Sequence, residues 1–544
     1  MAEEFCRRPA PPVDVLEHFV DVYRIKLHLQ PLPIFNLTGL TDRLMAGPQY
    51  LLWSFLAVVL TFSNHIFYQN TEDIAKDLYS RSSEYAVMKL AWEGDPNPEV
   101  IQALCLVALK HIRAQQPTRA WMVIGVGTRL CALRPPHHDG SSLIRGDDST
   151  SRAYWSVFVL ERFFLSRTMG LSSAETPEYP ESAPLPPPIV AAMGNTFSNS
   201  ATLSAQQTSP LGRDGIGPPF YRLVSLWGKV GCYMHSLREG ELEEPWLPDS
   251  TISKLNIELI EHEARVGKEH LLSNLEFSAR SAAEIAQYCE YWNPWIAGEI
   301  LWHAISAILN HPFIHLVVLR AQEGIPQSSG FLQQKCDQAL YHASWVFRLI
   351  QLTEGLMEIV NPLVGDAVAA TATVLWPFQF TRTPKIVQTA RDDLIKCDNF
   401  LSQMALTWPH MSNKVNIIRK LQALAEKNRK TPAADEATIC FQPTLFCSLL
   451  DPQFGETVSN GLPNTDLDPL SENDSQSKMH LKTHFVHPLL EEQCSGRQQE
   501  ETFSAPNSTE DFFMSTDNMD QFIIEELSSH FLQSGLWNMA PDSI

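Results

Sequence analysis

The chain has 544 residues, of which 44% are apolar and 19% are charged, and this is enough to bury one large core or two ordinary ones. Its ten cysteines are scattered and its first residues are charged and proline-rich, so we expect buried free thiols and neither a signal peptide nor a disulfide framework. The net charge of −21 excludes a broadly basic surface of the kind that binds a phosphate backbone.

The first third of the chain is predicted to be helical. Residues 1–12 are expected to be disordered, and apolar residues then recur at steps of three and four. Thr71 and Thr118 stand where helix N-caps are expected. The expected helices are Val13–His28, Leu51–Tyr68, Thr71–Trp92, Pro98–Gln115, Thr118–Leu133 and Thr150–Met169.

One apolar stretch, Tyr50–Tyr68, lacks Asp, Glu, Lys and Arg, as a membrane-spanning helix would. Its dense apolar part covers only Leu51–Phe62, whereas a span needs about 20 predominantly apolar residues. We therefore expect a buried core helix here and no membrane partner.

Residues 176–219 are rich in Pro, Ser, Gly, Thr and Asn, which predicts a mobile insertion because such a segment buries too little apolar surface. Helical patterns resume near Phe220, and no sustained two-residue alternation occurs. The predicted fold class is all-α, with one large irregular domain over residues 13–430 that holds about 12 or more helices. The later helices are expected at Tyr221–Glu239, Thr251–His270, Ala282–His311, Gln333–Thr353, Pro362–Phe380, Pro384–Trp408 and Ser412–Lys427.

The last part of the chain, residues 431–544, holds most of the net negative charge, with 19 Asp or Glu and three Lys or Arg. Its composition predicts a disordered tail, within which 511–539 forms an amphipathic pattern. Met519, Ile523 and Phe531 share one helical face of that pattern, and acidic residues lie opposite. This favours an activation segment that folds into a coactivator groove, and the alternative is a C-terminal helix that docks on the domain.

The segment SRAYWSVFVLERFFLSRTMGLS, Ser151–Ser172, has an informative order of residue types. An arginine and the aromatic pair Tyr154-Trp155 begin it, Glu161-Arg162 follows an apolar run, and Gly170-Leu171-Ser172 precedes proline-rich residues. This order resembles the fungal-specific transcription factor domain, the regulatory middle region of binuclear zinc cluster (Zn2Cys6) activators. The family usually has Asp-Arg where this chain has Glu161-Arg162, and Gly-Arg-Pro where it has Gly170-Leu171-Ser172. The match is therefore incomplete at these two positions.

Further pieces of the same resemblance follow one another over residues 13–410. They are Phe19 with Pro31-Leu32-Pro33-Ile34-Phe35, Arg119-Ala120-Trp121 with the segment 133–139, Trp302-His303 with Asn310-His311-Pro312-Phe313, Asn361-Pro362, and Trp408-Pro409. The resemblance implies an inhibitory, effector-sensing or dimerisation module of a nuclear regulator.

The zinc cluster of that family needs six thiolates that share two zinc ions, and this chain contains no Cys-x2-Cys. Cys440 and Cys447 alone have the x6 spacing of the cluster, and we expect this to be incidental. The family's zinc ions are therefore not expected as cofactors of these residues. DNA is expected to be reached only indirectly, through an N-terminal module lost by truncation or through a partner protein.

The predicted helix Thr150–Met169 is apolar over much of its circumference and should be buried. Arg152, Glu161 and Arg162 are then expected to be packing and salt-bridge residues rather than ligands of a substrate. No catalytic, cofactor-binding or metal-binding residue is assigned, and the chain is not expected to be an enzyme.

Other motifs in the sequence are weaker. His137-His138-Asp139 lacks a third metal ligand, and His311 with His315 lacks the Glu of a His-Glu-x-x-His site. Gly125-x-Gly127 and Gly228-Lys229 lack the further glycines of nucleotide-binding loops.

The enzyme alternative is an all-α fold similar to terpene synthases. Asp392-Asp393 with Asp398 resembles an aspartate-rich magnesium motif, but carboxylates on one helical face lie three or four residues apart. Asn473-Asp474 with Ser477 resembles the second motif, in which Leu481 occupies the place of the Glu. These departures disfavour the enzyme.

Together these features favour a regulator of RNA polymerase II transcription in a fungus, for example of a metabolic or biosynthetic gene cluster. The second hypothesis is a DNA-free co-regulator that pairs with a zinc-cluster factor. The expected partners are coactivators bound by the acidic tail, a second copy of the chain or a zinc-cluster factor, and a small-molecule effector.

Overall fold

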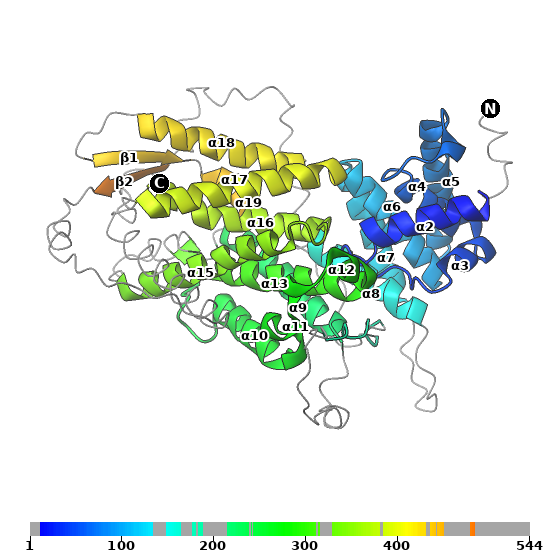
Figure 1. Ribbon diagram of the computed structural model, residues 1–544, viewed down its shortest axis with the longest axis horizontal. Coiled ribbons are helices and arrows are strands. Elements are labelled where there is room, and N and C mark those ends of the chain that lie inside the picture. Colours follow the sequence, from blue (N-terminus) through cyan, green and yellow to red (C-terminus); the bar gives the residue numbers. More distant parts are fainter. Residues whose placement is uncertain are drawn as a thin grey trace, which may run out of the picture.

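The all-α fold class is confirmed by a computed structural model, in which helices form nearly all of the regular structure. The helices gather into two bundles at opposite ends of the longest axis of the molecule (Figure 1). The structure describes residues 11–133, 148–164, 177–180, 183–188, 215–238, 241, 243–311, 314–315, 329–380, 384–430, 436–441, 443–450 and 479–484.

The N-terminal bundle is drawn in blue and cyan in Figure 1. Its helices are α2 Val13–Lys26, α3 Leu40–Ala46, α4 Gln49–Val59, α5 Glu72–Trp92, α6 Pro98–Arg113, α7 Pro117–Ala132 and α8 Asp148–Phe164. Helix α6 lies at its centre, where it packs against α4, α5, α7 and α8. Asn97 caps α6 by accepting the Glu99 N–H, and Pro98 occupies the first helical position, which needs no N–H.

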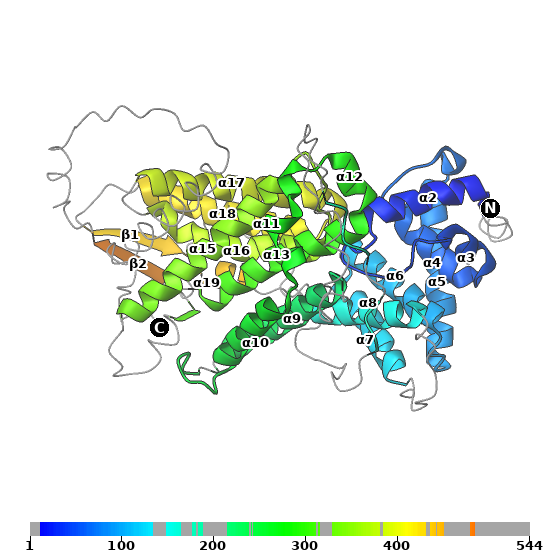
Figure 2. The same ribbon diagram turned by 60° about the horizontal axis from the view of Figure 1, so that its bottom comes forward.

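The C-terminal bundle is built around the almost wholly buried helix α13, which packs against α9, α10, α15 and α16. Strands β1 and β2 form an antiparallel pair at the end of this bundle far from the N-terminal helices (Figure 2). The elements are α9 Gly217–Arg238, α10 Thr251–Arg265, α11 Leu272–Leu275, α12 Ala282–Gln287, α13 Cys289–Leu309, α15 Ser329–Thr353, α16 Pro362–Leu375, α17 Pro384–Thr407, α18 Met411–Lys430, β1 Glu436–Phe441, α19 Pro443–Leu450 and β2 Met479–His484.

Helix α8 joins the two bundles, because it packs against α6 and α7 and also against α9. Every residue from Trp155 to Phe163 is buried, and Arg162 lies with its guanidinium carbon 4.9 Å from the centre of the Phe158 ring. Gly228 of α9 faces this arginine, and a Cβ at that position would lie 2.9 Å from Arg162 Cδ. The close approach of α8 and α9 therefore requires a glycine at 228.

Polar contacts also connect the bundles. Arg113, at the end of α6, donates hydrogen bonds to the carbonyls of Thr61 and Thr407, and Thr407 lies 294 residues further along the chain. The Gln30 side-chain oxygen accepts the Val360 N–H at 2.9 Å. Because these backbone groups are satisfied across the junction, the bundles form one packed unit.

Three predicted helices are wrong in extent. The predicted helix Pro362–Phe380 ends at Leu375, and a 3-10 helix covers Trp376–Phe380. The predicted helix Leu51–Tyr68 ends at Val59, because Thr61 bonds back to the Val58 carbonyl and a polar run follows before the 3-10 turn at Ile66–Tyr68. The predicted helix Thr251–His270 ends at Arg265, and a separate 3-10 turn covers Lys268–His270.

The predicted helix Ala282–His311 is in fact two helices. Helix α12 ends before Tyr288, whose φ of −106° and ψ of 33° leave the helical range. Pro294 then lies inside α13 and lacks the N–H that would bond to Glu290. Of the two predicted N-caps, Thr71 precedes α5 but its hydroxyl donates to a preceding carbonyl instead, and Thr118 lies inside α7.

The region after residue 431 contains more structure than its composition predicts. Helix α19 packs against α16 and α18, and the Phe446 ring meets the Trp376 ring edge to face at 5.4 Å. The prediction failed here because the burial of α19 depends on distant partners rather than on local composition. The predicted insertion 176–219 falls mostly outside the described residues, and the activation-like segment 511–539 falls wholly outside them.

One described segment, Pro362–Phe380, is long and apolar enough to cross a membrane, but 94% of its most apolar stretch is buried inside the protein. The shorter apolar helix α4 is also largely buried. Both segments are core helices of the bundles in which they lie.

The glycine contact between α8 and α9 can be tested with a matched pair of variants. Gly228→Ala is expected to lower the thermal unfolding midpoint, because overpacking at such a site typically costs about 1–3 kcal/mol. Gly298→Ala in α13 is the control, because its Cβ would meet the nearest atom at an ordinary 3.7 Å and alanine favours the helix. A midpoint for Gly228→Ala equal to or above that of Gly298→Ala would contradict the contact.

Candidate functional site, a charged cavity at the junction of the two bundles

A cavity of about 300 Å³ opens where the loop after α2 meets α8, α9 and α13. Proline and aliphatic side chains form much of its wall, and polar side chains reach it from four separate segments. The polar side chains that line it are Asn36, Thr38, Arg152, Tyr221 and Glu290. A hollow in which polar side chains converge among proline and aliphatic ones is a common form of small-molecule site.

Arg152 reaches the cavity from the first part of α8, although only 6% of the residue is exposed. Its Nε donates to Asp148 Oδ2 at 2.6 Å, and its Nη1 donates to the Phe35 carbonyl at 3.3 Å. Asp148 also accepts a hydrogen bond from Asn36 Nδ2 at 3.4 Å. Because Asp148 lies one helical turn before Arg152, the pair directs the guanidinium toward the loop and the cavity.

Glu290 lines the cavity from the first turn of α13. His28 Nε2 lies 2.9 Å from Glu290 Oε1, and the His28 side chain is fully buried whereas that of Glu290 is 43% exposed. Burial lowers the pKa of His28, so the imidazole is neutral and donates its Nε2–H. This hydrogen bond is the main cause that lowers the pKa of Glu290, which is therefore a carboxylate at neutral pH.

A stack of three rings supports one wall of the cavity. Tyr221 of α9 stacks on Trp155 of α8 at 4.9 Å between ring centres, and Trp155 stacks on Tyr179 at 4.6 Å. The Trp155 Nε1 also donates to the Glu178 carbonyl at 3.2 Å. These contacts hold the short segment that contains Pro180 against α8, so that Pro180 completes the wall.

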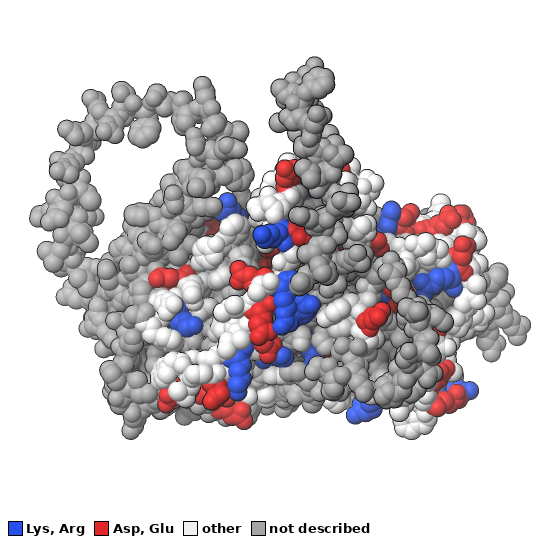
Figure 3. Space-filling model, turned by 90° about the horizontal axis from the view of Figure 1, so that it is seen from below, with Lys and Arg blue, Asp and Glu red and all other residues white. Residues whose placement is uncertain are grey.

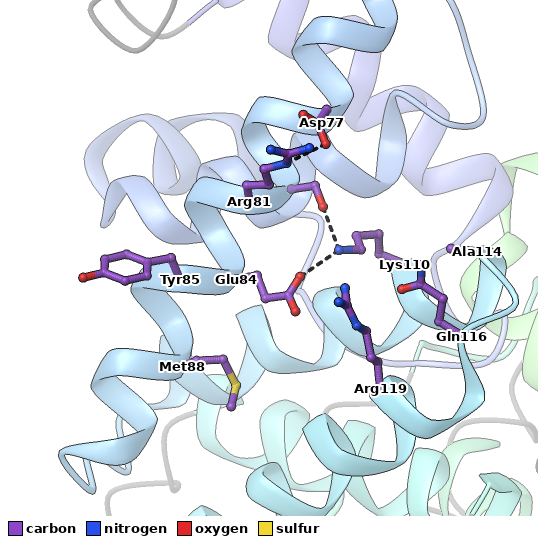
Figure 4. A pocket seen from close by; sticks show the side chains of 10 residues that line it. Asp77, Arg81, Glu84, Tyr85, Met88, Lys110, Ala114, Gln116 and Arg119 are labelled. Carbon is purple, nitrogen blue, oxygen red and sulfur yellow. Dashed lines mark hydrogen bonds and ion pairs between the residues drawn. The ribbon is translucent and has the colours of Figure 1, made fainter. Parts of the chain in front are cut away.

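A wider groove of about 680 Å³ lies between α5, α6 and the start of α7 (Figure 4). Lys110 donates to Ser80 Oγ at 2.6 Å and to Glu84 Oε2 at 2.9 Å, while Glu84 Oε1 lies 3.2 Å from the buried His111. Desolvation alone would raise the pKa of Glu84, but the Lys110 hydrogen bond and charge outweigh it and lower that pKa. The central charges of the groove are therefore paired with one another, and the groove lies within one bundle, whereas the cavity lies between the two.

The histidines of the sequence motifs do not converge on a site. His311 Nε2 lies 3.1 Å from Thr373 Oγ1, and His315 Nε2 lies 3.0 Å from the Leu309 carbonyl. Within the described ranges there is no group of three or more His, Cys, Asp or Glu side chains that could hold a metal ion. His137-His138-Asp139 lies outside those ranges.

The aspartates of the enzyme alternative have separate surroundings. Asp392 is exposed, whereas Asp393 is buried and pairs with Lys396 at 3.0 Å. Asp398 accepts two hydrogen bonds from Arg419, at 2.8 and 2.9 Å. A metal bound to diphosphate would need these carboxylates on one face, so their arrangement argues against a terpene-synthase-like site.

The remaining sequence motifs have structural roles or lie outside the described residues. Gly125 and Gly127 lie inside α7, and a Cβ at Gly127 would lie 3.3 Å from the side chain of Val157. Neither these glycines nor Gly228 begins a helix after a strand, as nucleotide-binding glycines do. The residues 473–477 lie outside the described part of the chain.

No protein-family model and no curated protein matches this chain. Of the polar side chains around the cavity, sequence reasoning had singled out only Arg152. It missed Glu290 and Tyr221 because the cavity forms from segments far apart in the chain. The one local signal was an acidic residue, Glu290, at the start of an otherwise apolar helix.

Buried histidines make the stability of the fold depend on pH. Burial lowers the pKa of His311, His315 and His410 to about 3, and that of His262 and His342 to about 4. In the unfolded chain a histidine protonates near 6.5, so below this pH the unfolded state binds more protons than the folded state. Stability is therefore lost as the pH falls from 6.5 toward the folded pKa, by about 1.4 kcal/mol per pH unit for each such histidine.

We predict that in His311→Gln the unfolding free energy falls less steeply between pH 6.5 and about pH 4. The slope should be smaller by about 1.4 kcal/mol per pH unit, because one proton fewer is taken up on unfolding. Urea denaturation at a series of pH values measures the slopes of this variant and of the natural chain. Identical slopes for His311→Gln and the natural chain would show that His311 is not a buried neutral histidine.

Proposed function

We propose that this protein regulates RNA polymerase II transcription in a fungal nucleus. Residues 13–430 act as its regulatory domain, and the acidic residues 431–544 act as its activation region. The observation that carries the proposal is the ordered set of pieces between residues 13 and 410 that resembles the fungal-specific transcription factor domain. An all-helical fold, in which the described part of the most informative piece lies on α8, supports it.

The distribution of charge supports an indirect route to DNA. On the face drawn in Figure 3, Lys and Arg side chains are interspersed with Asp and Glu among the coloured residues. On α10, for example, Arg265 pairs with Glu261 at 3.1 Å. Since a phosphate backbone binds where positive charge is concentrated, we propose that sequence-specific contact comes from outside these residues. A zinc-cluster factor, as a heterodimer partner, is the source we favour.

The activation region is proposed from its sequence pattern. Acidic residues surround bulky apolar ones in 511–539, and no Lys or Arg follows Arg497. Segments of this kind fold on a coactivator, with their apolar stripe in a hydrophobic groove. The proposed function is therefore recruitment of the transcription machinery rather than catalysis.

Fusion of residues 505–544 to a heterologous DNA-binding domain is expected to activate a reporter gene in fungal cells. Combined substitution of Phe522, Ile523 and Phe531 by alanine should remove the activation, because these side chains are the anchors of the apolar stripe. Substitution of Ser528, Ser529 and Gln533 by alanine is the matched control and should retain it. Background output from the unsubstituted fusion, at equal protein level, would rule out the activation region.

A further inference from the structure

The cavity at the junction of the bundles has opposite charges on two of its walls. Arg152 approaches from α8, beside the first residues of α9, and Glu290 approaches from α13. We propose that this cavity binds a small zwitterion of amino-acid size, with its carboxylate against Arg152 and its ammonium group against Glu290. The regulatory meaning of such binding rests on the proposed function, whereas the binding itself does not.

The anionic end of the ligand is assigned from two features of one wall. The Arg152 guanidinium lines the cavity while almost wholly buried, and a ligand carboxylate would share it with Asp148 and the Phe35 carbonyl. Ile216 and Gly217, at the N-terminal end of the 22-residue helix α9, line the same wall, and a helix N-terminus adds partial positive charge. A planar carboxylate matches both, because guanidinium groups and helix N-termini are the common carboxylate receptors of proteins.

The cationic end is assigned from Glu290. His28 occupies only Oε1 of this carboxylate, and Oε2 makes no hydrogen bond or ion pair within the described part of the chain. The buried His28 is neutral, so it orients Glu290 without cancelling its charge. An ammonium group can therefore bind Oε2 with full charge attraction while the His28 hydrogen bond stays in place.

The rest of the wall limits the size and shape of the ligand. Pro33, Pro180, Pro184 and Pro294 give rigid apolar contacts, and the Tyr221 ring is held by its stack on Trp155. A cavity of about 300 Å³ lies at the lower end of the range for small-molecule sites. A single amino acid fits within this volume.

Isothermal titration calorimetry on the purified full chain tests the proposal. The probes are the 20 standard L-amino acids, each titrated separately, together with β-alanine and γ-aminobutyrate to vary the separation of the two charges. For the tightest ligand, the analogues that lack either the ammonium or the carboxylate group are titrated next. We expect each analogue to bind at least about tenfold more weakly, since hydrogen bonds to charged groups contribute that much. Equal binding of either analogue, or no binding by any zwitterion at millimolar concentration, would overturn the proposal.

Variants then place the ligand in the cavity. Glu290→Gln should weaken binding at least about tenfold, because it removes one charge and keeps the shape. Glu93→Gln, an exposed residue at the end of α5, is the matched control and should leave affinity unchanged. If Arg152→Gln fails to fold, Glu290→Gln and the analogue series still decide the outcome. Unchanged affinity in Glu290→Gln would place the ligand elsewhere and refute the site.

These measurements use no transcription assay, so they separate the two proposals. Binding that depends on Glu290 without any effect on reporter output would retain the ligand site and remove its regulatory role. Reporter activity without binding of any zwitterion would retain the proposed function and refute the site.

Discussion

The ion pair between Arg152 and Asp148 is the interaction on which the cavity wall formed by α8 depends. Arg152 also donates to the Phe35 carbonyl, so a single buried side chain connects α8 to the loop after α2. Losing one partner of a buried ion pair typically costs about 3–5 kcal/mol, and the cost here is lower because Asp148 is 32% exposed. Of this pair, Arg152 lines the cavity wall. Stability and the candidate site therefore share one residue.

Much of the fold can be predicted from local patterns, and the failures have local causes. Periodicity identifies the amphipathic and apolar helices, including α6. The apolar residues that such a helix buries recur at regular steps in its own sequence. The end of α4 is missed because Thr61 bonds to the backbone, and α19 is missed because its burial depends on Trp376. Local patterns cannot reveal such distant packing.

The cavity itself lies beyond the reach of sequence reasoning. His28 and Glu290 are 262 residues apart, and only the packing of both bundles brings them to 2.9 Å. Arg152 could be noticed from its place in an apolar helix, although as a structural residue. The segment 151–172 is thus informative about the scaffold. Arg152 can be identified as a cavity residue only from the three-dimensional structure. A ligand in this cavity would contact Arg152 of one bundle and Glu290 of the other.

Chromatin occupancy of the tagged full-length protein in fungal cells tests the central claim, that this chain is a transcription regulator, most directly. Immunoprecipitation followed by sequencing is expected to show the protein at a discrete set of promoters, with the transcripts of those genes changed when the protein is deleted. Uniform background signal across the genome, with no transcript changed on deletion, would contradict the claim.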